Sequence, residues 1–192
     1  MPSTVTPAPA DLAAAPLDEL RAHLARATGR GVSALGAGVG LWTVFAAVGA
    51  LVPDATIRAL VIVFGSGLLF PLSMLVARML QLDYFAKGNP LGPLAGIVGA
   101  VQVLFIPLMV GATFTTPDAV PWYLAVLVGA HLLPYAWLYF SRTYLVTAIA
   151  IPVAAGVVGG LLGWSAVGAP LVTAGILLVA SVSLARRNRA ER

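Results

Sequence analysis

Charged side chains are scarce in this 192-residue chain. They make up 9% of its residues, against roughly 25% in an ordinary soluble domain, while apolar residues reach 60%. A water-soluble fold of this length could not cover its surface with so few charges. The composition therefore predicts one membrane domain rather than one or two globular domains.

Cysteine is absent, which excludes a disulfide framework and thiolate chemistry. Asp and Glu are absent from the long apolar runs. Paired-carboxylate catalysis and carboxylate-based proton coupling would therefore have no carboxylates inside a membrane. Two histidines, His23 and His131, cannot build a His-rich zinc site, and the sequence contains no phosphate-binding loop or dinucleotide fingerprint. We expect no metal and no cofactor, and an enzyme is the least favoured class of protein.

Apolar runs of about 20 residues begin at Val32, each long enough for a helix to cross ~30 Å of hydrocarbon. The tripeptide Gly163–Ser165 is taken as a tight turn, since without it the final run would be about twice one crossing. The expected fold class is an all-α, polytopic transmembrane bundle of six spans: Val32–Val52, Thr56–Leu80, Leu91–Ala112, Ala119–Phe140, Thr143–Leu162 and Ser165–Ala185.

Residues 1–30 precede the predicted transmembrane domain (31–185), and residues 186–192 form a basic tail after it. The first ten residues are rich in Pro, Ala and Thr and are predicted to be disordered. After Pro16, leucines recur at helical spacing up to a stop at Gly29–Gly31, which predicts a short amphipathic helix. This helix could bind a membrane surface or a partner, or serve only as a lead-in to the first span, and the lead-in is favoured.

Basic residues mark the ends of the apolar runs instead of forming one dense patch. The net charge of +4 therefore indicates topology signals and not a nucleic-acid surface. With six spans both termini lie on one side of the membrane, together with every Arg and Lys except Arg58. The positive-inside rule then places both termini and the 81–90 loop in the cytoplasm.

A shift of 64 positions aligns the second and fourth runs without gaps. It pairs Pro53–Asp54–Ala55 with Pro117–Asp118–Ala119, and Arg78 with Arg142. The chain would then consist of two or three repeated helical hairpins, and parallel repeats of this kind occur in transporters. The alternative, equally weighted, is that any membrane hairpin under the same topology rules begins with a turn and ends with Arg.

His131, Tyr135, Tyr139 and Arg142 recur at intervals of four, four and three residues. This spacing predicts a polar stripe on one face of the fourth span, from mid-membrane to the cytoplasmic edge. An ionisable group inside a span is a functional candidate by default, and histidine titrates near neutral pH. The alternative is a neutral His131 that bonds a backbone carbonyl, with the Tyr and Arg side chains as interfacial anchors.

Gln102, midway along the third span, could bond across to His131. Arg78 could join Arg142 at the inner mouth as an anion or headgroup site, although snorkelling is the favoured use of both. Glycines at four-residue spacing permit close helix packing, either within the chain or between copies of it in a homo-oligomer. Kinks are predicted at the prolines inside spans two to five: Pro71, Pro107, Pro134 and Pro152.

The segments LLFPLSMLVARML (68–80), NPLGPLAG (89–96) and GAHLLPYAWLY (129–139) together resemble a family of small bacterial membrane proteins known only as a domain of unknown function. The resemblance spans roughly residues 32–185. It implies an integral protein of the bacterial envelope, with no established activity and no functional residues to transfer. Together with the charge pattern, it predicts a multi-pass protein of the bacterial cytoplasmic membrane, surrounded by lipid.

Two functional hypotheses remain open. The first is a small transporter or channel-like protein, of unknown substrate, in which spans two, three and four line a path containing Gln102, His131 and Tyr135. The second is a non-transporting scaffold or regulator that binds partners through its glycine faces and its N-terminal helix. A water-accessible polar cavity around His131 would favour the first, and a dry, tightly packed surround would favour the second.

Overall fold

The computed structural model describes residue 12 and residues 14–191, so the segment predicted to be disordered lies outside the described part of the chain. Within that part the chain forms helices and turns and no strand. Helices long and apolar enough to cross a membrane confirm the predicted six-span fold class: Gly29–Leu51, Ala55–Met79, Gly92–Thr115, Pro117–Leu138, Arg142–Leu161 and Gly168–Ala190.

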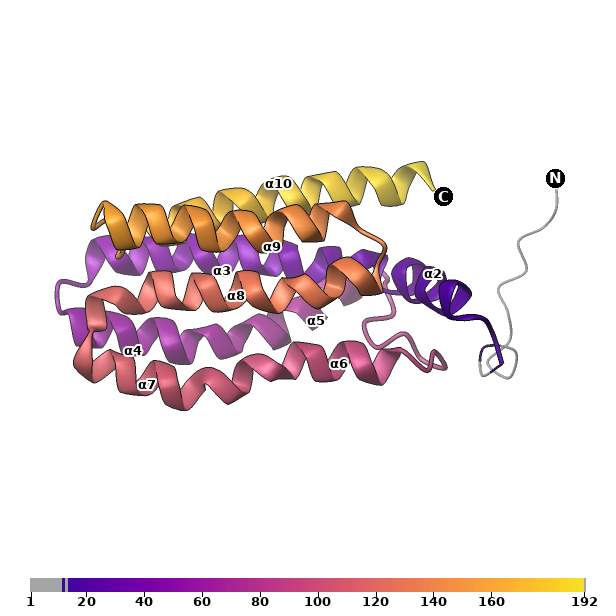
Figure 1. The fold of residues 1–192 in the computed structure, drawn as a ribbon, viewed down its shortest axis with the longest axis horizontal. Helices are drawn as coiled ribbons and strands as arrows, with labels where there is room; N and C mark the ends of the chain where they lie inside the picture. The colour runs from indigo at the N-terminus through magenta and orange to yellow at the C-terminus, as the bar shows by residue number, and fades with distance from the viewer. Residues whose placement is uncertain (1–11, 13, 192) are drawn as a thin grey trace.

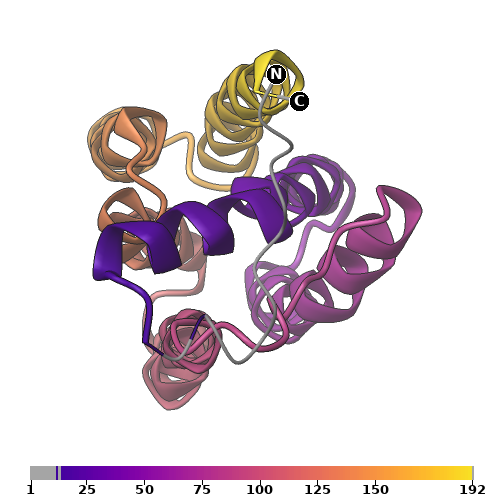
Figure 2. The same ribbon diagram turned by 90° about the vertical axis from the view of Figure 1, so that its right-hand side faces the viewer.

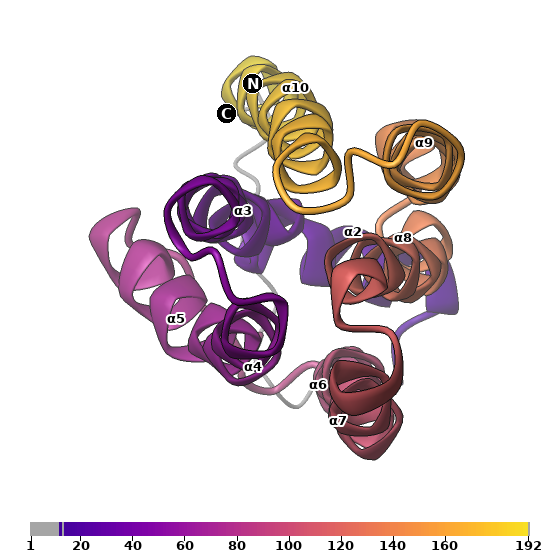
Figure 3. The same cartoon turned by 90° about the vertical axis from the view of Figure 1, so that its left-hand side faces the viewer.

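The spans run side by side along one axis (Figure 1). Seen along that axis they form a ring in which α3 packs on α10, α10 on α9 and α9 on α8, while α4 and α7 complete the circle (Figure 3). The α-helices of the ring are α3 (Val32–Leu51), α4 (Ala55–Gly65), α5 (Leu69–Met79), α6 (Gly92–Ala100), α7 (Ile106–Thr115), α8 (Val120–Leu138), α9 (Arg142–Ala155) and α10 (Gly168–Ala190).

The two ends of the ring differ, because helix α2 (Leu17–Ala27) crosses only one of them (Figure 2). We call this the α2 end. The last turns of α10 lie at the same end, whereas the α3–α4 connection and the short η4 turn (Pro117–Ala119) lie at the other (Figure 1). This arrangement agrees with an even number of crossings.

Apolar side chains fill the middle of the ring. Trp42 and Phe45 of α3 meet edge to face, with ring centroids 5.6 Å apart. Ile62 of α4 and Leu177 of α10 are 0% and 3% exposed. The same cluster includes three side chains of α8: Leu124, Val128 and Leu132. In this conformation the centre of the bundle is therefore dry and apolar.

Non-α segments interrupt three of the spans. Pro71 and Pro107 follow two of these segments closely, and Pro152 precedes the third. Proline removes an amide donor from the α-helical ladder, which accounts for a local change of winding. Non-α winding thus lies near three of the four prolines, in η2 (Ser66–Leu68), η3 (Val101–Phe105) and the π-helical η5 (Gly156–Leu161), whereas Pro134 lies inside an uninterrupted α8.

The sixth span differs from its predicted bounds at both ends. It begins at Gly168 and not at Ser165, because turns and bends occupy residues 162–167. At the other end α10 continues to Ala190, so most of the predicted tail 186–192 is helical. This extension carries polar side chains beyond the apolar part of the helix.

Helix α2 forms where the sequence predicts it. Pro16 is its N-cap residue, and Asp18 and Glu19 lie in the first turn, where they complement the helix dipole. Its apolar side chains Leu20 and Leu24 are 9% and 0% exposed. The face expected to be free for a membrane surface or a partner is therefore occupied within the chain itself.

The predicted stop after α2 is a short helical turn, η1 (Gly29–Gly31). All three of its residues have positive φ angles, of 57°, 52° and 68°. Glycine enters this left-handed region freely, whereas an L-residue such as Arg30 costs roughly 1–2 kcal/mol there. Glycine at both flanking positions lets the chain reverse from α2 into α3 with only one strained residue.

Helices α8 and α9 are in close contact at Gly129, which is not among the glycines at four-residue spacing. A Cβ added to Gly129 would lie 2.3 Å from Cδ of Pro152 and 3.0 Å from the carbonyl oxygen of Ala148. Both neighbours belong to α9 and neither can move without displacing that helix. Backbone contact at this crossing therefore requires the absence of a side chain.

We expect Gly129→Ala to destabilise the bundle by about 1–3 kcal/mol, because overpacking at this crossing forces α8 and α9 apart. The matched control is Gly111→Ala in α7, where an added Cβ meets nothing within 4 Å. That control should change stability by less than ~0.5 kcal/mol. Reversible unfolding in mixed detergent micelles measures both, and equal effects of the two variants would contradict the proposed contact.

Candidate functional site

His131 lies on α8, about two turns from the α2 end of that helix. Its Nδ1 atom is buried, and no described residue gives it a hydrogen bond. The imidazole lies beside the carbonyl of Val98 on α6 and meets the ring of Tyr135 edge to face, with centroids 5.5 Å apart. Pro134 follows within the uninterrupted α8. Leaving a buried polar atom without a partner lowers stability by roughly 1–3 kcal/mol. His131 is the least satisfied polar group of this span.

Gln102 does not bond to His131, as the sequence had suggested it could. Its Nε2 atom lies in η3 and donates to the carbonyl of Leu127 on α8, at 3.3 Å. Leu127 is one helical turn before His131. Gln102 therefore connects spans three and four near His131, but it leaves the imidazole nitrogen without a partner.

Three tyrosines continue from His131 toward the α2 end. Tyr135 and Tyr139 stack with centroids 5.6 Å apart, and Tyr144 of α9 lies 5.4 Å from Tyr139. The Tyr135 hydroxyl donates to the carbonyl of Ala95 on α6, and the Tyr144 hydroxyl to that of Arg30, each at 2.8 Å. The tyrosine cluster thus joins α6, α8, α9 and η1.

Arg142 is not part of the stripe, and its predicted place on the fourth span is wrong. Phe140 has a φ of 46°, so the chain reverses there and Arg142 begins α9. The neighbours of Tyr139 are instead Tyr144 and the hydroxyl of Thr28, which lies 3.4 Å from the Tyr139 oxygen. Linear spacing contains no signal for these partners, because they come from other elements.

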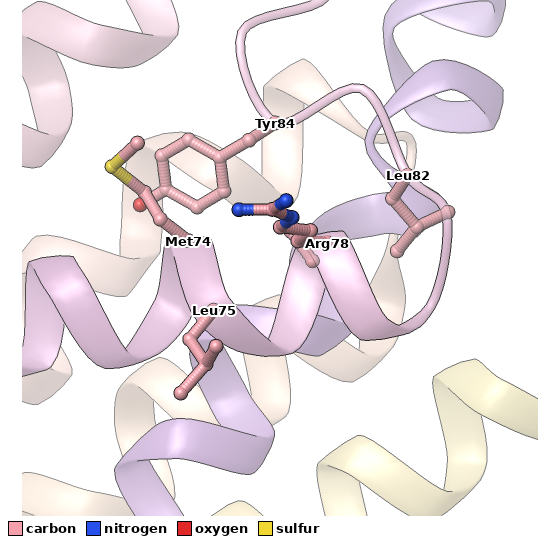
Figure 4. A pocket seen from close by; sticks show the side chains of 6 residues that line it. Met74, Leu75, Arg78, Leu82 and Tyr84 are labelled. Atoms are coloured by element: carbon pink, nitrogen blue, oxygen red, sulfur yellow. The ribbon is translucent and has the colours of Figure 1, made fainter.

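Arg78 and Arg142 line two separate pockets at the α2 end, so they do not form the joint anion site that was the alternative to snorkelling. The Arg78 pocket has a volume of about 360 Å³. Figure 4 shows its labelled side chains, with Arg78 extending from α5 toward the loop that carries Tyr84. Burial raises the pKa of the Tyr84 hydroxyl, and a hydrogen bond with Ser73 opposes that shift. Neither of these two pockets is lined by His131.

The polar groups of the bundle mainly form hydrogen bonds that stabilise the helices and their contacts. The hydroxyls of Ser66 and Ser73 donate to carbonyls of their own span at 2.6 Å. Among the residues that the structure describes, no group of three His, Cys, Asp or Glu side chains could hold a metal ion. The side-chain bonds of the described residues include no serine or threonine hydroxyl paired with a histidine or carboxylate base.

Arg30 joins the η1 turn to the last turns of α10. Its side chain is buried, its Nη1 donates to Oδ1 of Asn188 at 2.6 Å, and its Nη2 pairs with Glu191. Asn188 donates in turn to the carbonyl of Gly29 at 2.8 Å. Arg187 completes the group through an ion pair of 2.9 Å with Glu191. We call these five residues the terminal clamp.

Helix α2 is held on two further sides. Nε of Arg21 donates to the carbonyl of Trp137 at 2.9 Å, and its guanidinium lies 3.1 Å from the ring centroid of Phe140. On the opposite side Asn89 donates to the carbonyl of Leu20 at 2.8 Å. These contacts fix α2 to the end of α8 and to the loop before α6.

A family model described as a family of unknown function (DUF7010) matches residues 17–187. The chain belongs to this family. The match begins at the first residue of α2 and extends into the last turns of α10, so it includes more of the α2 end than the resemblance over residues 32–185. No curated protein and no solved structure matches the chain. Family membership assigns no activity, and the function has to be inferred from the site.

The terminal clamp should weaken in acid. Hydrogen bonds from Arg187 and Arg30 hold the pKa of the Glu191 carboxyl below its usual value of 4.5. A depressed folded-state pKa means that the stabilisation is complete above the unfolded pKa and is lost as the pH falls through the folded one. Because Glu191 is exposed, we expect Glu191→Gln to cost less than ~1 kcal/mol at pH 7.

Unfolding of the wild type and of Glu191→Gln in detergent between pH 7 and pH 3 measures this effect. The stability difference between them should vanish at the acid end. Arg189→Gln is the control, since Arg189 is exposed on the same last turns of α10, makes no ion pair with the described residues and does not titrate in this range. A difference that persists unchanged at pH 3 would contradict the assignment of the clamp to the carboxylate.

Proposed function

We propose that this protein is a small transporter or channel-like membrane protein with a closed bundle, whose polar path passes between spans two, three and four. The path would include His131, Gln102 and Tyr135. The observation that carries the proposal is the buried Nδ1 of His131, which has no partner in the described part of the chain. An intramembrane polar group left unsatisfied in one conformation is stabilised by a second conformation that admits water or a substrate.

The α2 end would face the cytoplasm of a bacterium. The described basic residues other than Arg58 lie in elements of this end: α2, η1, the α5–α6 loop, and the nearby ends of α5, α9 and α10. Arg58 is paired with Asp118 at the opposite end. The positive-inside rule assigns such a charge-rich end to the cytoplasmic face.

Span three is the best candidate for a moving element. Only 6% of its most apolar window is buried, against 39% for the window of span four. Helix α6 contains no buried residue, and its tie to α8 depends on a few polar contacts such as Tyr135 to Ala95 and Gln102 to Leu127. The 3-10 segment η3 separates α6 from α7, where winding changes act as hinges. Displacement of α6 would uncover His131.

A water path can be tested without knowledge of the substrate, because the chain has no cysteine. Single-cysteine variants His131→Cys and Gln102→Cys in proteoliposomes would be treated with a charged, membrane-impermeant methanethiosulfonate reagent. Minor conformers populated at roughly 0.1–10% are sufficient for slow labelling over minutes to hours. We expect both thiols to react, because an opening of α6 would admit water to them.

Two controls define the result. Ile62→Cys lies in the dry core at 0% exposure, and Leu104→Cys faces outward at 76% exposure, where lipid would surround it. Neither should react. If the thiol at position 131 is as inert as both controls, there is no water path and the transport proposal fails.

A non-transporting scaffold remains the second candidate. Its support is the dry centre of the bundle together with the open surface of span three, where Cβ atoms added to Gly96 and Gly111 would meet nothing. The N-terminal helix adds less support, because Leu20 and Leu24 of its apolar face are buried against the bundle. Inert thiols at positions 102 and 131 would favour this candidate.

A further inference from the structure

A second, shallow and open pocket at the α2 end is lined by groups that can bind an anion. It has a volume of about 310 Å³ and lies where α2, the end of α8 and the start of α9 meet. Its lining combines two arginines and a serine with apolar side chains: Arg21, Ser141, Arg142, Trp137, Phe140 and Leu145. None of these residues belongs to the proposed path around His131.

Ser141 is the group in this pocket that lacks a partner. The residue is 3% exposed, and its Oγ atom is buried without a hydrogen bond to any described residue. It occupies the N-cap position of α9, yet its side chain does not cap the helix. A buried hydroxyl without a partner calls for an acceptor, and an anion in the pocket would supply one.

The start of α9 adds positive potential beside Ser141. The first amides of a helix have no intrahelical carbonyl partner, and the helix dipole favours negative charge at this end. Arg142, the first residue of α9, is exposed and makes no ion pair with the described residues. The pocket is thus lined by Ser141 and Arg142 at the N-terminus of a helix, the kind of place where proteins bind anions.

The neighbouring charges leave this pocket positive. Arg21 is buried on the other side, 3.5 Å from Asp18, whose own side chain is 83% exposed. Arg187 donates to the carbonyl of Phe140 at 3.3 Å and is also paired with Glu191. Arg142 is therefore the cation with no carboxylate partner among the described residues.

The apolar part of the lining indicates the source of the anion. Trp137, Phe140 and Leu145 are 50%, 46% and 44% exposed. They lie at the end of two membrane spans, where aromatic side chains occupy the headgroup region of a bilayer. A free phosphate would leave this apolar surface uncovered, whereas the glycerol and acyl chains of a lipid would cover it.

We propose that this pocket binds the phosphodiester headgroup of an anionic phospholipid in the leaflet at the α2 end. The phosphate accepts hydrogen bonds from the Ser141 hydroxyl, from the first amides of α9 and from Arg142. The acyl chains lie along Leu145 and Trp137. The inference goes beyond the proposed transport activity and does not depend on it.

The experiment is lipid titration of the purified protein in detergent, followed by native mass spectrometry. The probes are phosphatidylglycerol and phosphatidylcholine with the same acyl chains. We expect selective retention of phosphatidylglycerol by the wild type. Arg142→Gln should weaken that retention roughly five-fold, the effect of one basic residue near a membrane surface. Arg78→Gln is the matched control, since Arg78 is also exposed but its pocket contains neither a helix N-terminus nor an unbonded hydroxyl.

Ser141→Ala provides a readout that distinguishes binding from a structural role. Without anionic lipid this variant should be at least as stable as the wild type, because it removes a buried hydroxyl that has no partner. With phosphatidylglycerol the order should reverse, since only the wild type donates to the phosphate. Equal losses in Arg142→Gln and Arg78→Gln would overturn the proposal in favour of diffuse surface attraction. Displacement of the lipid by millimolar inorganic phosphate would also overturn it, in favour of a soluble anion.

Discussion

The bonds of Arg30 organise the α2 end of this bundle. Its backbone reverses the chain between α2 and α3, its carbonyl accepts the Tyr144 hydroxyl, and its side chain holds Asn188 and Glu191 on α10. One residue therefore sets the position of α2, α9 and α10 relative to α3. The tyrosine cluster and the lipid pocket both lie against elements placed in this way, so their geometry depends on that single strained residue.

The six spans are not equally buried, and the proposed function depends on this difference. Spans one, four and six bury 39% of their most apolar windows, whereas span three buries 6%. In lipid, helices associate through close packing and polar bonds without a hydrophobic driving force between them. Span three has few close-packed contacts and few polar bonds. Two of its hydrogen bonds to α8 lie within a turn or two of His131. The unsatisfied His131 is thus covered by the span with the smallest buried share.

Hydropathy, charge and turn chemistry were sufficient to predict the fold. The length of each apolar run and the placement of Arg and Lys gave six spans, and Pro16 with Gly29–Gly31 bounded α2. The site was predicted only in part, since His131, Tyr135 and Tyr139 do share a face of α8. Arg142 leaves that face because Phe140 adopts a left-handed conformation, which no residue-type rule requires of phenylalanine. The hydrogen-bond partners of Gln102 and Thr28 depend on the register between helices. The hairpin repeat stays a prediction.

The distance along the chain between Arg30 and its partners has a consequence for biosynthesis. Asn188 and Glu191 are 158 and 161 residues away from it. Chains emerge from the ribosome at roughly 5–20 residues per second, so η1 is made several seconds before the α10 residues that bind it. During that interval the guanidinium of Arg30 has neither Asn188 nor Glu191 as a partner. The terminal clamp therefore forms late, only after the polar turns of α10 have been synthesised.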